Sequence, residues 1–379
     1  MILQKRPLRR IPLETKYGGD DSIGVMTRKC KIPVQAGHNA PVEFPHIWSR
    51  LSPATPTHVW DSYWRFAAER QEVFFARMED RDWPFTDDPI LRTYRFTNVY
   101  RASDRVSQYL IRNVIYSGLS TPEETFFRIL LFKTFNRIDT WERLTRDIGE
   151  LSWSNYVYSK YDTVLLKALD NGERIYSAAY IMASGKSAFF HERKHQNHLR
   201  LIELMMHDGV PQKVVESRSM EEVFNILKSY PTIGDFLAYQ YVIDINYSNL
   251  IDFSEMDFVV AGPGAKEGIR KCFHDTGGWS PDELIKWVTD SQEREFNRLE
   301  IDFRDLFGRP LQLIDCQNLF CEIDKYARVA YPEMNGDSGR KRIKQMYKLN
   351  RNKIDYRYPP KWQLDVCQKD NISETPVGY

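Results

Sequence analysis

The chain has 379 residues, of which 42% are hydrophobic and 28% charged, as in a globular protein with one large domain or two interlocked domains. This composition excludes a disordered chain, a collagen-like protein and a disulfide scaffold. The sequence contains no run of 18 apolar residues and no signal-peptide core, so we expect a cytoplasmic protein without membrane contact. The five cysteines form no CxxC pair, which favours reduced thiols.

The net charge of +1 hides a strong asymmetry along the chain. Residues 325–361 hold 11 Lys or Arg against 3 acidic residues, and residues 1–32 hold 8 against 3. In the C-terminal region, cations alternate with Tyr347, Tyr356, Tyr358 and Trp362, as on a surface that follows phosphates and stacks on bases. We therefore expect contacts to double-stranded DNA there, with Arg340, Lys341 and Arg342 as candidates. The alternative is a solvated basic tail on an acidic body.

Helix signals dominate the chain after a Pro- and Gly-rich start, so we predict a mainly α protein. Helical periodicity is present at 62–78, 101–116, 139–149, 159–172, 195–209 and 316–329. Three further helices begin with capping signals at Thr121, Ser219 and Ser280, each followed three residues later by Glu. The predicted organisation is an N-terminal arm packed on the body (1–60), a helical subdomain (61–210), a helix-hairpin-helix catalytic subdomain (211–330) and a basic C-terminal extension (331–379).

Two glycine turns that open helices are candidate phosphate contacts. The first follows the helix at 219–229, and its residues Ile233, Gly234 and Asp235 lead into a second helix near 236. A hairpin of this kind presents unpaired backbone N–H groups to an anion, although an ordinary helix corner is the alternative. The second turn, AGPGAKEGIRK, offers Gly262, Gly264 and Lys271, either to a phosphate or as a structural clamp. A nucleotide P-loop is excluded there, because GK[ST] at the right spacing is absent.

Several segments resemble a known family. YPTIGDFLAYQ resembles the hairpin of the helix-hairpin-helix DNA glycosylases, with Tyr230 and Thr232 in place of the usual Leu and Gly. FTNVYRASDRVSQYLI, FRILLFKTFNRIDTWERL, DFVVAGPGAKEGIRKCF and DCQNLFCEIDKY are similar to segments of the alpha-glutamyl/putrescinyl thymine pyrophosphorylase family, which is related to the helical domain of hydroxymethyluracil DNA kinases. The resemblance covers residues 93–330. It implies a glycosylase-like, mainly α enzyme that acts on heavily modified pyrimidines in DNA.

The resemblance also directs the search for a catalytic carboxylate. In helix-hairpin-helix glycosylases it follows the hairpin by about twenty residues and stabilises the sugar cation. That window holds Asp252, Glu255 and Asp257, of which Asp257 is the first choice; Asp244 and Glu322 are further catalytic candidates. There is no Lys between 229 and 265, which argues against a lyase that uses a Schiff base. The cysteine spacings exclude an iron-sulfur cluster, and we expect no cofactor.

Polar residues inside apolar, family-like segments are candidates for a base pocket: Asn98, Arg101, Lys133, Asn136 and Asn318. Asp315, Asn318, Glu322 and Lys325 share one helix face, which is either part of this pocket or an exposed ladder of ion pairs. His191, His195 and His198 have metal-ligand spacing, but their charged neighbours favour a solvated helix face and no metal site.

These features predict a monofunctional DNA glycosylase that flips and excises a hypermodified, hydroxymethyl-derived and glycosylated pyrimidine from phage DNA. The abasic sites that it leaves would serve antiviral defence, and we expect it to act as a monomer. The alternative is a transferase that displaces pyrophosphate from activated hydroxymethyluracil in DNA to build a hypermodified thymine. A third possibility is an inactive reader that only binds modified DNA. The sequence leaves open which base modification is recognised.

Overall fold

A computed structural model describes residues 54–335, 341–350 and 354–364, and within them the chain is mainly helical, as predicted. The predicted N-terminal arm lies almost wholly outside these residues. The first elements are β1 (Thr55–Pro56), α1 (Val59–Met78), α2 (Pro89–Thr93), η2 (Arg101–Ser103), α3 (Arg105–Leu110), η3 (Ile111–Ile115), α4 (Pro122–Phe135), α5 (Ile138–Ile148), α6 (Tyr158–Asp170), α7 (Lys186–Phe189) and α8 (Lys194–His207). They are followed by α9 (Val210–Glu216), α10 (Met220–Lys228), α11 (Asp235–Asn246), α12 (Pro263–Cys272), β2 (Phe273–Asp275), α13 (Pro281–Asp290), α14 (Gln292–Arg298), α15 (Leu313–Ala330), η4 (Pro332–Met334) and η6 (Pro360–Trp362).

The predicted helix starts are present. The side chains of Thr121, Ser219 and Ser280 each accept a hydrogen bond from the backbone N–H three residues later. The reciprocal bond of a capping box forms at Ser280, whose N–H donates to Glu283. At α4, however, the carboxylate of Glu124 accepts from the N–H groups of Trp153 and Ser154 instead. A residue expected to cap its own helix thus holds a distant loop against it.

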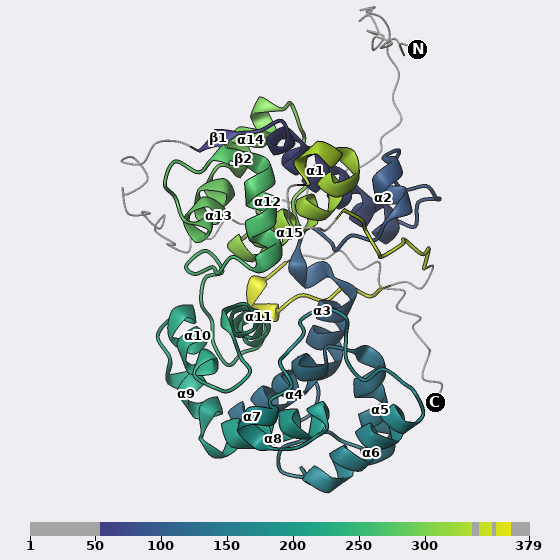
Figure 1. Ribbon diagram of the computed structural model, residues 1–379, viewed down its shortest axis with the longest axis vertical. Coiled ribbons are helices and arrows are strands. Elements are labelled where there is room, and N and C mark those ends of the chain that lie inside the picture. The colour runs from purple at the N-terminus through teal and green to yellow at the C-terminus, as the bar shows by residue number, and fades with distance from the viewer. Residues whose placement is uncertain (1–53, 336–340, 351–353, 365–379) are drawn as a thin grey trace, which may run out of the picture. The chain divides into compact units, whose positions relative to one another are not determined.

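The helices form two groups that meet at α11. Helices α12 and α15 pack along each other, and α1 and α13 pack on them. In the second group, α4 packs against α8 and α9, and α6 packs against α5 and α8. Helix α11 contacts α4 and pairs with α10 in the predicted hairpin, and Figure 1 shows it between the two groups. The two short strands β1 and β2 pair antiparallel. Among the described residues, no helix is long and apolar enough to cross a membrane.

Glycines allow α12 and α15 to approach closely. A Cβ atom on Gly268 would lie 1.9 Å from the carbonyl oxygen of Phe320, and one on Gly264 would lie 3.0 Å from the sulfur of Cys321. The first distance is far below a van der Waals contact, and the Phe320 carbonyl belongs to the helix backbone, so it cannot rotate away as a side chain could. The two helices therefore hold their spacing only because Gly268 has no side chain.

His195 and His198 of α8 are buried, so the prediction of a solvated helix face is wrong for these two residues. His195 Nε2 lies 2.8 Å from Asp162, and His198 joins the hydroxyl of Tyr176 at 2.9 Å to the carbonyl of Ala183 at 2.7 Å. Burial lowers the pKa of His198 to about 4, which keeps the ring neutral. These contacts fix the loop that follows α6. Within the described residues, no cluster of His, Cys, Asp and Glu suits a metal ion.

Gly268→Ala should destabilise the protein strongly, because the new methyl group must push α12 and α15 apart. Overpacking of a rigid core contact typically costs about 1–3 kcal/mol, and the 1.9 Å contact places this variant at the upper end, about 3 kcal/mol. Urea denaturation followed by circular dichroism measures the loss. Gly234→Ala is the matched control, since a Cβ there meets nothing within 4 Å. Equal stability of the two variants would contradict this account of the helix crossing.

Candidate functional site

A cavity of about 550 Å³ lies where the two helix groups meet. Its walls come from the segment 95–97, η2 and α3, the end of α4, the loop at 177–180, α11 and α15, and Gln345 adds to its rim. Residues far apart in the chain therefore converge on one chamber. The charged, polar and aromatic residues that line it include Arg95, Arg101, Arg105, Lys133, Asn136, Tyr180, Phe236, Asp244, Asn318, Glu322 and Lys325.

A buried carboxylate, Asp244 of α11, joins two cations in the cavity wall. One oxygen lies 2.6 Å from Arg101 Nη2 and the other 2.8 Å from Lys133 Nζ, and each of the three side chains is at most 4% exposed. Burial lowers the pKa of Lys133 to about 8, although Asp244 opposes the shift. For Arg101, burial favours proton loss, but the attraction of Asp244 and Tyr247 raises the pKa well above its usual value. The wall therefore holds a permanent guanidinium beside an amine that can lose its proton near neutrality.

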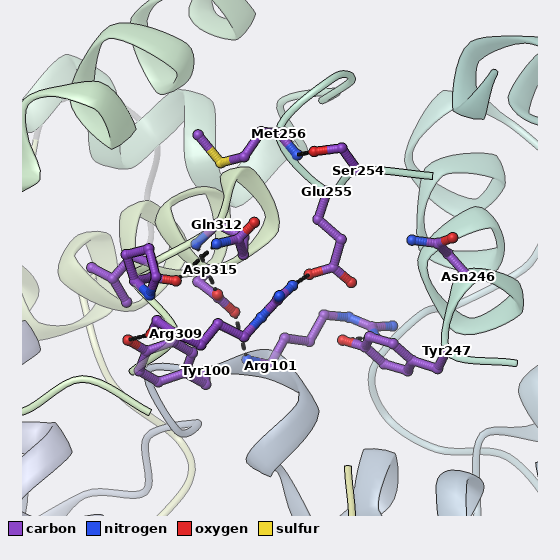
Figure 2. Close-up of polar contacts among 12 residues, drawn as sticks. Tyr100, Arg101, Asn246, Tyr247, Ser254, Glu255, Met256, Arg309, Gln312 and Asp315 are labelled. Atoms are coloured by element: carbon purple, nitrogen blue, oxygen red, sulfur yellow. Dashed lines mark hydrogen bonds and ion pairs between the residues drawn. The ribbon is translucent and has the colours of Figure 1, made fainter. Parts of the chain in front are cut away.

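The guanidinium of Arg101 is held on all sides. Its Nε donates to Gln240 at 3.0 Å and its Nη1 to the hydroxyl of Tyr247 at 3.2 Å. Its backbone N–H donates to Asp315 at 2.8 Å. Figure 2 shows Arg101 reaching Tyr247, with Asp315 at its backbone end. Since these are charge-assisted or buried bonds, the orientation of Arg101 is fixed before any ligand enters.

A second layer of charge lies behind Arg101. Glu255 accepts from Arg309 Nη2 at 2.9 Å, as Figure 2 shows, and the hydroxyl of Tyr100 donates to the Arg309 carbonyl at 2.7 Å. Burial, followed by repulsion from Glu255, raises the pKa of Asp315 to about 7, although backbone N–H donors oppose the shift. None of Glu255, Arg309 and Asp315 is among the residues that line the cavity. These residues support Arg101 from behind.

Aromatic rings face the polar wall. Tyr180 stacks on Phe236 with ring centroids 5.8 Å apart and planes 8° from parallel. The ammonium of Lys133 lies 4.0 Å from the centre of the Tyr180 ring. Sequence reasoning missed both rings. Tyr180 lies in a loop without periodicity, and its only signal is the run of small residues that precedes it in SAAY. Phe236 lies in the apolar start of α11, where no signal distinguishes it from a core residue.

The rim carries unpaired positive charge. Arg95 and Arg105 are exposed, line the cavity and form no ion pair within the part of the chain that the structure describes. Glu322 is engaged: it accepts from the N–H of Thr97 at 3.0 Å and pairs with Lys325 at 2.7 Å. The rim therefore offers two guanidiniums to an anionic ligand.

Four of the five predicted base-pocket residues line the cavity, namely Arg101, Lys133, Asn136 and Asn318. Asn98 does not; its side chain accepts from Arg70 at 2.6 Å and donates to the carbonyl of Ser103. Along the predicted face of α15, the side chains of Asn318, Glu322 and Lys325 reach the cavity. Whether they contact a base stays a prediction.

The candidate carboxylates separate into two sets. Asp244 and Glu322 line the cavity. Asp257, the first choice from sequence, is exposed in the loop after α11 and is not among the lining residues; Asp252 is also exposed, and its carboxylate lies 3.4 Å from Lys361. Glu255 is buried against Arg309. None of these three carboxylates lines the chamber, so Asp244 becomes the preferred candidate.

The two glycine turns differ in exposure. Gly234 begins α11 in the open, whereas a Cβ on Gly262 would lie 2.6 Å from the ring of Phe236. The second turn is therefore a clamp on the hairpin. Lys271, predicted to contact DNA, is buried with its ammonium 2.9 Å from Asp324, and this placement contradicts the prediction.

The basic C-terminal segment passes the cavity. Lys341 and Arg342 are exposed, while Arg340 lies outside the described residues. The N–H of Arg95 donates to the carbonyl of Gln345 at 3.0 Å, which ties this segment to the rim. Tyr356 and Tyr358, expected on a stacking surface, are instead buried in the core.

The family described as "5-hmdU DNA kinase, helical domain" matches residues 57–336. The chain is 27% identical over 329 residues to a 5-hmdU DNA kinase of Bacillus phage SP10, a match that covers 82% of this chain and 51% of that protein. The chain thus spans about half the length of this curated relative. No solved structure gives a significant match.

These comparisons overturn one prediction. The relative is named a DNA kinase, which is a transferase, so the assignment as a monofunctional DNA N-glycosylase, a hydrolase, is wrong. The predicted antiviral role depended on base excision and therefore loses its basis.

Asp244→Asn should lower the pKa of Lys133 below its value of about 8, because the carboxylate raises that pKa against the effect of burial. NMR titration of ¹⁵N-labelled lysine side chains measures this, with Lys133→Met identifying the resonance. A matched Asp257→Asn variant should leave the titration unchanged. An unaltered Lys133 titration in Asp244→Asn would show that the two groups are not coupled.

Proposed function

The chain belongs to the family of the 5-hmdU DNA kinase helical domain, and we propose that it is a transferase acting on hydroxymethyluracil in DNA. An amine attacks the 5-methylene carbon of an activated hydroxymethyluracil base. The bond from this carbon to oxygen breaks, and pyrophosphate leaves with the electron pair. The attacking nitrogen then loses a proton to a base in the cavity, and a hypermodified thymine remains in the DNA.

The observation that supports this reaction best is the unpaired charge at the cavity rim. Arg95 and Arg105 are exposed there and form no ion pair within the described residues. Guanidiniums bind phosphate oxygens through paired, charge-assisted hydrogen bonds, and they would stabilise a leaving pyrophosphate. Tyr180 and Phe236 supply flat apolar faces for the base.

Lys133 is the group in position to take the proton. With a pKa of about 8, part of its population is the neutral amine at neutral pH, as a general base requires. Asp244, 2.8 Å away, orients the amine and stabilises the ammonium formed when the proton arrives. Arg101 Nη2 lies 2.6 Å from the other oxygen of Asp244 and holds the carboxylate in place.

The family relationship alone would also suggest phosphoryl transfer. The 379 residues contain no GxxxxGK[ST] motif, because Tyr180 stands where the first glycine would precede Gly185-Lys186-Ser187. The structure places this tripeptide at the start of the short helix α7, with Lys186 paired to Glu192. We therefore assign to this chain the displacement of pyrophosphate and not the transfer of phosphate from a nucleotide.

We infer that the α10–α11 hairpin contacts the DNA backbone, in the manner of helix-hairpin-helix proteins. Gly234 begins the 12-residue helix α11, and nothing lies within 4 Å of the place where its Cβ would be. The helix N-terminus favours an anion, and the open glycine lets a phosphate approach. Lys341 and Arg342, exposed on the segment beside the cavity, extend the basic surface.

Duplex DNA that carries a pyrophosphorylated hydroxymethyluracil is incubated with the protein and a mixture of amines. The reaction should release pyrophosphate and yield an amine-substituted thymidine in equal amounts. Mass spectrometry of the digested DNA measures the nucleoside. Replacing Arg95 and Arg105 with Gln should reduce kcat/KM about 10- to 100-fold, the range expected for a lost hydrogen bond to a charged group.

Asp257→Asn is the matched control and should retain activity, because Asp257 lies outside the cavity. Abasic sites in place of an amine-substituted thymidine would contradict the proposed transfer. An unchanged rate in the double Arg variant would show that the two guanidiniums take no part in the reaction.

DNA binding should weaken when the exposed cations of the C-terminal segment are reversed. Each lost phosphate contact lowers the slope of log Kd against log salt by roughly 0.9, so Lys341→Glu with Arg342→Glu should lower it by nearly 2. Fluorescence anisotropy at several salt concentrations measures this on modified and unmodified duplexes alike. Lys213→Glu on the exposed face of α9 is the control. An unchanged slope would place the segment away from the DNA.

A further inference from the structure

A second cavity, of about 320 Å³, lies beside an exposed tryptophan. Trp83 is 40% exposed and lines this groove. Its ring stacks on Tyr347, with centroids 5.1 Å apart and planes 8° from parallel, and Phe85 meets it edge-on at 5.5 Å. An indole fixed by two neighbouring rings offers an ordered flat surface that loses little conformational entropy when a ligand stacks on it.

The groove has balanced charge, whereas the chain segment beside it is positively charged. The lining holds two cations, Arg77 and Arg81, and two acids, Asp80 and Asp82, and Arg81 also pairs with Glu79 at 3.1 Å. A balanced groove with an aromatic wall suits an uncharged base better than a phosphate. The adjoining segment 341–350 has four cations and no acid, and those cations are exposed, which suits phosphates.

The same segment connects the groove to the first cavity. The N–H of Tyr347 donates to the carbonyl of Thr93 at 2.9 Å, and the N–H of Arg95 donates to the carbonyl of Gln345 at 3.0 Å. Gln345 lines the first cavity and Tyr347 supports the second. Two residues of extended chain span about 7 Å, which is roughly two nucleotide steps along one DNA strand.

We propose that Trp83 and Tyr347 form a stacking subsite for the base of a nucleotide that flanks the modified one on the same DNA strand. This rests on the proposed action on DNA. The modified base occupies the first cavity, the exposed cations of segment 341–350 follow the connecting phosphates, and the flanking base lies against the free surface of Trp83. Two anchored nucleotides would set the register of the strand, so that the reacting base meets Lys133 and Asp244.

The test removes the flanking base from the DNA and the Trp83 ring from the protein, first separately and then together. Oligonucleotides carry a central hydroxymethyluracil and an abasic residue at one flanking position at a time, and anisotropy gives Kd for the full chain. For the wild type, one position within three nucleotides should show a 5- to 100-fold rise in Kd, which corresponds to about 1–3 kcal/mol of stacking at about 1.4 kcal/mol per tenfold.

In Trp83→Ala, binding of intact DNA should weaken by a similar factor, and the abasic substitution at that position should have no further effect. Trp83→Phe keeps an aromatic face and should recover most of the affinity, which separates lost stacking from misfolding. Phe190→Ala is the matched control, because Phe190 is 83% exposed and lines neither cavity. The proposal is overturned if the abasic residue and Trp83→Ala reduce the binding free energy additively, or if Trp83→Ala binds like the wild type. The groove would then serve another occupant, such as an apolar peptide.

The two proposals fail separately. Loss of the coupling between Trp83 and a flanking base, with pyrophosphate release intact, would remove the stacking subsite alone. Coupling without any pyrophosphate release would leave the subsite in place and overturn the proposed transfer.

Discussion

The cavity depends on the buried carboxylate of Asp244. Its two oxygens meet Arg101 and Lys133 at 2.6 and 2.8 Å, out of contact with water. Removing one member of a buried ion pair typically costs about 3–5 kcal/mol, because the remaining charge is left without a partner. Each of the three side chains therefore fixes the other two. Through Gln240 and Tyr247, which bind the Arg101 guanidinium, the constraint extends along α11 and holds α4, α11 and η2 in a single arrangement.

The burial that fixes this geometry also prepares its chemistry. Water is excluded from Lys133, so its ammonium is less stable there than in solvent and its pKa falls to about 8. At the rim the situation is reversed, since Arg95 and Arg105 are exposed and their guanidiniums are accessible to a ligand. In the proposed reaction, Lys133 inside accepts a proton and the two arginines outside bind an anion, which are opposite uses of cations. They follow from the difference in solvent access between the floor and the mouth of one cavity.

Features determined by neighbouring residues were predictable from the sequence. The caps at Thr121, Ser219 and Ser280 and the hairpin before Gly234 involve groups within a few positions of one another. Arg101 and Lys133 were also predictable, because charged residues within apolar runs must be paired if they are buried. The choice of Asp257 rested on a count along the chain, which gives a separation and no direction, and the structure leaves this residue exposed and outside the cavity lining. Tyr180 was missed because α8, through His198, places its loop.

The C-terminal segment shows why a run of charge and aromatic residues cannot be interpreted as one surface. Tyr358 is buried with its hydroxyl 2.8 Å from Ser103, in the turn that begins with Arg101. Trp362 covers the guanidinium of Arg309, 3.9 Å from its ring centre, and Arg309 holds Glu255. The aromatic residues thus attach the segment to the supports of Arg101, while Lys341 and Arg342 stay in solvent. Because one stretch of chain does both, the DNA contact proposed for its cations would lie on a surface that is packed directly onto the structure holding the cavity in place.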